Sequence, residues 1–249
     1  MNFSEIRIIG EDEILRGSKS KYVCFFGGIF IFFCFLAMRF STYISFLFSN
    51  SGGIPYILIS YIVVLSIGPF MTLISSFDIV SSETETGSVR YILSKVQRSS
   101  FILGKFFFLF LVFMSASSGI ALISLIYQYS TGNAFQFESI ILFWISSSLY
   151  LGCFIGIFLF ISTLSANNKI SFTMSVVFLG ILIFFILQGN ESYLKYITPF
   201  FYGIKNMEFM KGFPVGAGYL TAFESLFSMF LYILVFLSMS LLAIKRRDL

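Results

Sequence analysis

Side chains that usually perform catalysis are scarce in this sequence of 249 residues. Histidine is absent, which excludes a Ser-His-Asp triad and zinc sites built on imidazole. No two of the three aspartates (Asp12, Asp78 and Asp248) share one apolar segment, so no aspartyl pair is predicted. Gly104-Lys105 is similar to the end of a phosphate-binding loop but lacks the earlier glycine and the following Ser or Thr. We therefore expect this chain to have no catalytic residue, bound metal or cofactor of its own.

The polar segment 78–105 has the pattern of a short amphipathic helix. Ser81 and Ser82 precede Glu83 and Glu85, and Gly87 then predicts a break or tight turn. Beyond the glycine, apolar residues recur at the i, i+3, i+4, i+7 spacing of one helical face: Val89, Ile92, Leu93 and Val96. The other faces carry Arg90, Ser94, Lys95 and Gln97.

Such a helix must bury its apolar stripe against a membrane surface or in a hydrophobic groove of a partner protein. Glu83 and Glu85 would be repelled by an anionic leaflet. Their presence favours a docking helix over simple adhesion to the membrane.

The elements that must position this helix are membrane spans. The chain is 57% hydrophobic and 11% charged, with a mean hydropathy of +0.93, so lipid must be its main solvent. Crossing a bilayer requires roughly 20 apolar residues of helix, and six continuous apolar runs qualify. They are Tyr22 to Met38, Ile54 to Phe77, Phe106 to Tyr129, Ser139 to Leu164, Ile170 to Leu187 and Tyr219 to Ile244.

The positive charges predict the orientation. With the N-terminus in the cytoplasm, twelve Lys and Arg residues lie inside and four outside, which places both termini inside by the positive-inside rule. Segment 78–105 is then cytoplasmic. Because no soluble domain fits in the chain, any motor must be another polypeptide, unless an ion gradient drives the protein.

Two further segments are expected to lie at the membrane surfaces. Residues 1–20 mix apolar and charged positions, which favours an amphipathic helix at the inner interface over a plain solvated tail. Residues 188–218 are rich in aromatic residues and include Pro199 and Pro214. They are too apolar for a free loop, so short helices at the outer interface, or dipping partly inward, are predicted.

Polar residues of the second and fifth spans could line a pathway. Gly68-Pro69 interrupts the second span, because proline removes one backbone hydrogen bond. Small hydroxyl residues in membrane helices more often pack helices together, so most of these side chains should be structural. Glu138 and Glu224 lie near the outer boundary and Asp78 at the inner one; none reaches the midplane, which weakens the case for ion coupling.

These patterns together resemble one family of membrane proteins. An Asp ends the second span, Glu-x-Glu-x-Gly-Ser-Val-Arg-Tyr-Ile-Leu-Ser follows, and Arg98 and then Ile102-Leu103-Gly104-Lys105-Phe106 open the third span. The six-span plan, the short turn after the fourth span and the basic C-terminal end are similar too. Over nearly its whole length the chain resembles the ABC-2 type permeases of ABC transporters.

The resemblance implies roles for particular residues. In that family the loop at this position is a coupling helix that sits in a cleft of the nucleotide-binding subunit. Glu83, Glu85, Gly87 and Arg90 would orient it, and Arg98 and Lys105 would anchor the base of the third span at the inner interface. The second and fifth spans border the central pathway in the family, and segment 188–218 would form an outer gate. The pathway candidates are Tyr61, Ser66, Pro69, Thr72, Ser171, Thr173 and Ser175.

The implied function is that of the permease subunit of an ATP-driven exporter in the cytoplasmic membrane. ATP and Mg would bind to a separate ATPase subunit, and a second copy of the permease or a close paralogue would complete the membrane part. Two alternatives stay open on the residues alone. One is an ion-driven carrier or channel; the other is a membrane scaffold or immunity protein that binds a partner without transport.

Overall fold

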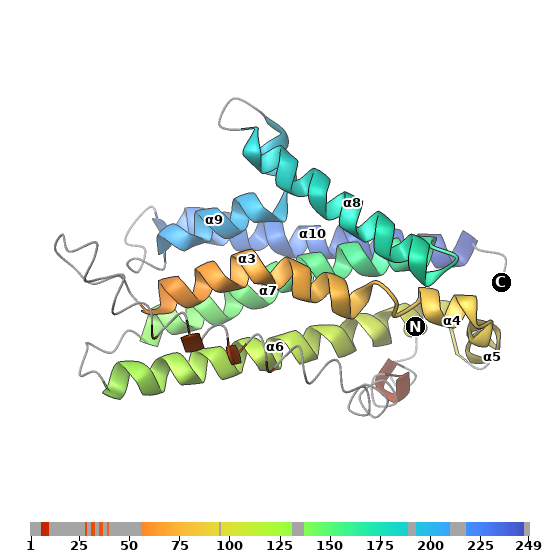
Figure 1. Cartoon of the computed structure of the whole chain (residues 1–249), viewed down its shortest axis with the longest axis horizontal. Helices are drawn as coiled ribbons and strands as arrows, with labels where there is room; N and C mark the ends of the chain where they lie inside the picture. Colours follow the sequence, from red (N-terminus) through yellow and green to blue (C-terminus); the bar gives the residue numbers. More distant parts are fainter. Residues whose placement is uncertain are drawn as a thin grey trace.

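The computed structural model describes residues 6–9, 28, 31–32, 35–36, 39, 56–94, 96–130, 137–188, 193–209 and 218–246. These residues form helices and turns, with no strand among them (Figure 1). The helices are α3 (Tyr56–Ser76), α4 (Ser81–Glu85), α5 (Ser88–Leu93), α6 (Arg98–Ser130), α7 (Phe137–Leu164), α8 (Asn168–Leu187), the 3-10 helix η1 (Tyr193–Ile197), α9 (Pro199–Phe209) and α10 (Gly218–Arg246).

Among the described residues, five helices are long and apolar enough to cross a membrane: α3, α6, α7, α8 and α10. They coincide with the second to sixth predicted spans. The first predicted span, 22–38, lies outside the described residues apart from short helical pieces. The all-helical class is therefore confirmed, and the count of six spans stays a prediction.

Helix α7 is the centre of the bundle. It contacts α3, α6, α8, α9 and α10, and 72% of its spanning segment is buried, the largest share of the five. Small residues allow this close packing. A Cβ atom on Gly152 would lie 2.9 Å from Ile233 of α10, and one on Gly68 of α3 would lie 2.7 Å from Leu151.

Helix α8 is packed much less tightly. Only 22% of its spanning segment is buried, and Figure 1 shows it running obliquely, with its C-terminal end well separated from the other spans. One stripe faces the protein, formed by Ser171, Ser175, Leu179 and Leu182. The other faces carry exposed apolar side chains such as Phe172, Val177 and Phe184.

The segment between α8 and α10 contains two short helices, η1 and α9, as predicted. Helix α9 inserts among α3, α7 and α10 (Figure 1). Asn206 of α9 is 2% exposed; its amide donates to Ser146 (2.8 Å) and its carbonyl accepts a hydrogen bond from Ser225. Ser146 is also hydrogen-bonded to Tyr61 at 2.7 Å. This buried polar network fixes α9 to three spans.

The described part of the N-terminal segment packs on α6. Residues 6–9 are helical; Ile6 and Ile9 are buried, whereas Arg7 and Ile8 are exposed. A Cβ atom on Gly104 would lie 2.7 Å from Ile9, so only glycine admits this contact without a shift. The remainder of the predicted interfacial helix lies outside the described residues.

Tyr150 donates the hydrogen bond that Pro69 cannot donate within α3. Proline has no N–H, so the carbonyl of Leu65, four residues earlier, lacks its helical donor. The hydroxyl of Tyr150 donates to that carbonyl at 2.9 Å. Tyr150 is fully buried, where an unsatisfied carbonyl would find no water.

Replacing Tyr150 by Phe should lower the free energy of unfolding by about 1–3 kcal/mol, because it leaves the Leu65 carbonyl without a donor. In a Pro69→Ala background, residue 69 regains an N–H for the same carbonyl, so the cost of Tyr150→Phe should fall by about 1 kcal/mol or more. Unfolding titrations of the four proteins in detergent would measure both costs. An equal cost in the two backgrounds would contradict this account of the hydrogen bond.

Candidate coupling site

The connection between α3 and α6 forms a helical hairpin at one end of the bundle. A turn over 77–80 leads into α4, Gly87 reverses the chain, and α5 returns towards α6. In Figure 1, α4 and α5 lie beyond the ends of α3 and α6, at the same end of the molecule as the start of α8. This end carries most of the residues that the sequence nominated for coupling.

A buried ion pair joins α4 to α6. The ammonium of Lys105 lies 2.9 Å from Oε1 of Glu83 and donates to the carbonyl of Ile79 at 2.7 Å. It also lies 4.9 Å from the ring centroid of Phe101. Lys105 is only 1% exposed, so its ammonium faces protein groups; that it anchors α6 at the inner interface stays a prediction.

A second set of hydrogen bonds joins α4 to the turn between α7 and α8. Ser162 of α7 accepts from the backbone N–H groups of Val80 and Ser81, both at 3.1 Å. Ser81 donates to the side chain of Asn168 at 2.6 Å, and the Asn168 N–H donates to the Glu85 carboxylate at 3.0 Å. Glu83 and Glu85 thus hold the same short helix to different spans.

Gly87 has φ +73°, in the left-handed region that favours glycine. It places α5 so that its apolar stripe faces the protein: Val89 is 2% exposed, and Ile92, Leu93 and Val96 pack partly buried against the core. The stripe therefore lies against the rest of the helical bundle. The face left open carries Arg90 and Tyr91, the latter 81% exposed.

Arg98 links the start of α6 to the end of α10. Its guanidinium donates to the carbonyls of Ile244 and Lys245, both at 3.2 Å. Carbonyls in the last turn of a helix lack intrahelical donors, so this cation caps α10. The expected anchoring role thus takes the form of a contact between two spans.

The candidate pathway residues do not gather into one site. Tyr61, Pro69, Thr72, Ser171 and Ser175 are buried, whereas Ser66 and Thr173 are exposed. Thr72 donates to the carbonyls of Gly68 and Pro69, and Ser171 donates to that of Phe77. The hydroxyls of Tyr61 and Ser171 thus join separate elements, whereas both hydrogen bonds of Thr72 stay within α3. That these residues line a pathway stays a prediction.

Several residues at this site were not found by sequence reasoning. Ser162 and Asn168 belong to spans remote in the chain from α4, and no local pattern connects them to it. For Lys105 the sequence does hold one indication of an internal partner. The residue directly precedes three phenylalanines, and a charged lysine is not stable in hydrocarbon without a partner. In the part of the chain that the structure describes, no group of three or more His, Cys, Asp or Glu could hold a metal ion.

Lys105→Met should lower the free energy of unfolding by about 3–5 kcal/mol, because the Glu83 carboxylate would remain buried without its cation. Adding Glu83→Gln should restore most of that loss. The pair of Lys205, which is partly exposed, and Glu224, which is exposed, lies 3.7 Å apart and supplies the control: Lys205→Met should cost no more than about 1 kcal/mol. Detergent unfolding curves would test this; equal losses for the two lysines would contradict the assigned burial.

A search among curated proteins found no match to the chain. The family model described as "ABC-2 family transporter protein" matches residues 11–249, nearly the entire sequence. Its five helices that are long and apolar enough to cross a membrane, counted among the described residues, agree with a multi-pass membrane protein. The chain belongs to the ABC-2 transporter family.

Proposed function

We propose that this chain is the permease subunit of an ATP-driven ABC transporter, coupled through α4 and α5 to a separate ATPase subunit. The single observation that supports it best is the hairpin of α4 and α5, which is held rigidly on one side and open on the other. Glu83 and Glu85 fix α4 to α6 and to the α7–α8 turn. Arg90 and Tyr91 form the open face, here called the docking face.

In this arrangement, a movement of the hairpin by a partner would be transmitted to the spans. Helix α5 packs its stripe on the permease core, so a partner that moves α5 must move what it rests on. The Glu83–Lys105 pair carries that force into α6, and Arg98 carries it on to α10. An ATPase that closes on ATP would thereby bias the spans between two packed arrangements.

The docking face has the chemistry of an interface anchor. Tyrosine and arginine are enriched among residues that dominate binding energy, because each combines a large contact area with a polar group. Tyr91 and Arg90 are adjacent and both exposed. We assign the ATPase contact to these two residues, and we assign support of the helix to Val89, Ile92, Leu93 and Val96.

The assembled transporter would contain two permeases and two ATPases in the cytoplasmic membrane, with ATP and Mg bound by the ATPases. The exposed faces of α3 and α8, which carry Ser66 and Thr173, would border the pathway between the two permeases. Both termini and the docking face lie in the cytoplasm in this proposal, because that orientation places twelve of sixteen Lys and Arg residues inside. Export is the direction that we propose.

Replacing Tyr91 with Ala, alone and with Arg90→Ala, should weaken binding of the ATPase about tenfold or more, because an interface anchor is lost. The measurement is copurification of the ATPase in mild detergent, with ATP hydrolysis of the reconstituted complex as a second readout. Tyr129→Ala is the matched control, since Tyr129 is 84% exposed near the opposite end of α6. A purified transporter with no nucleotide-hydrolysing companion, or equal losses for Tyr91→Ala and Tyr129→Ala, would overturn the proposal.

Single cysteines at two exposed tyrosines would test the orientation. Tyr193→Cys, in η1 beyond the end of α8, should react with a membrane-impermeant maleimide in intact cells. Tyr91→Cys should react only after the membrane is opened. Both side chains are more than 80% exposed, so burial cannot explain a difference, and the reverse pattern would refute the proposed topology.

A further inference from the structure

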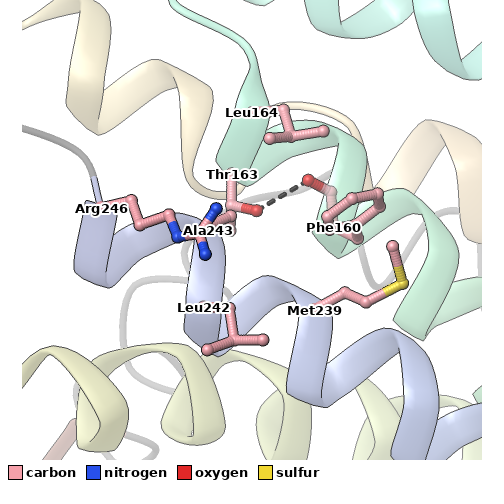
Figure 2. A pocket seen from close by; sticks show the side chains of 7 residues that line it. All are labelled: Phe160, Thr163, Leu164, Met239, Leu242, Ala243 and Arg246. Atoms are coloured by element: carbon pink, nitrogen blue, oxygen red, sulfur yellow. Dashed lines mark hydrogen bonds between the residues drawn. The ribbon is translucent and has the colours of Figure 1, made fainter.

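A groove runs between the ends of α7 and α10, apart from the residues of the docking face. It encloses about 470 Å³ and is lined by Phe160, Thr163, Leu164, Met239, Leu242, Ala243 and Arg246. Figure 2 shows Arg246 at one end, with Met239 and Phe160 toward the other. The groove is thus apolar along most of its length and cationic at one end.

The apolar part of the groove faces the surroundings of the bundle. Leu164 and Leu242 are 54% and 56% exposed, although both belong to helices able to span the membrane. The hydroxyl of Thr163 donates to the Phe160 carbonyl at 2.7 Å (Figure 2), so it adds no free polar group to the wall. This length of the groove therefore suits a hydrocarbon chain.

The cationic end suits a phosphate. Arg246 is exposed in the last turn of α10, and its guanidinium presents donors that match phosphate oxygens. It follows Met239 by seven residues, or roughly 10 Å of helix. Lys245, the residue before it, is also exposed. A headgroup with uncompensated negative charge would be favoured here over one that carries its own cation.

A second copy of the chain fits this groove less well. A symmetric contact is isologous, so it would bring the Arg246 of each copy near the same patch of the other. Two such cationic ends would repel each other. A soluble partner would have to enter between two membrane-spanning helices to reach Met239.

We propose that this groove is a binding site for one anionic phospholipid of the surrounding bilayer, with the phosphodiester on Arg246 and an acyl chain along Leu242, Met239 and Phe160. The proposal rests on membrane insertion alone. It depends neither on the ATPase nor on the direction of transport, so its failure would leave the proposed function intact, and the reverse holds too.

The test uses the full chain purified in detergent and titrated with phosphatidylglycerol or phosphatidylcholine, with bound lipids counted by native mass spectrometry. Phosphatidylglycerol should bind about tenfold more tightly than phosphatidylcholine. Arg246→Gln should remove that preference, Arg246→Lys should retain most of it, and Ala243→Phe should fill the groove and weaken both lipids. The controls are Arg90→Gln, which removes an exposed cation elsewhere, and Ser238→Phe, which adds the same ring at another exposed position of α10.

Three results would overturn the proposal: equal binding of the two lipids, the same loss with Arg90→Gln as with Arg246→Gln, or no effect of Ala243→Phe in a protein that elutes as wild type. A photoreactive residue in place of Leu242 gives an independent readout. Cross-linking to phosphatidylglycerol supports the site. Cross-linking to a second copy of the chain, or to another protein, refutes it.

Discussion

A backbone carbonyl or N–H group inside the membrane has no water to bind, and this constraint determines where the polar side chains of this chain lie. Tyr150 serves the carbonyl that Pro69 leaves open. Arg98 caps carbonyls at the end of α10, and Ser162 accepts from two N–H groups where α3 gives way to α4. In each case a side chain from one helix completes the backbone of another, so the same bonds that satisfy the backbone also fix the helices relative to one another.

The Glu83–Lys105 pair extends this logic from backbone groups to charges. Taking two charges out of water costs several kcal/mol each, and the cost is recovered only with good geometry and further hydrogen bonds. Lys105 has both, through Glu83 at 2.9 Å and the Ile79 carbonyl at 2.7 Å. Separating α4 from α6 would leave both charges unpaired, and this would cost several kcal/mol. The pair thus ties the hairpin to α6.

The sequence predicted the spans well because a bilayer demands long apolar runs, and five of the six runs coincide with helices that could cross it. Helix α6 begins at Arg98, two turns before the apolar run that starts at Phe106. The run of apolar residues alone did not reveal these two turns, nor that Lys105 within them is paired with a residue 22 positions away. The helical periodicity also showed which apolar residues share one face: Val89, Ile92, Leu93 and Val96. Periodicity predicts that such a face is buried, but it does not identify the surface that covers it. Contacts such as Asn206 with Ser146 join residues 60 apart, and no local rule reveals them.

The spans are packed unevenly. Helix α7 is enclosed by its neighbours, whereas α8 touches them along one narrow stripe. Packed cores change between discrete arrangements and deform little in between, so a displacement that reaches α8 through the α7–α8 turn meets less resistance than one that reaches α7. Asn168, the first residue of α8, is the residue that Ser81 and Glu85 hold. The hairpin is therefore bonded directly to the least buried span as well as to α6, and in the proposed transporter that span carries the exposed Thr173.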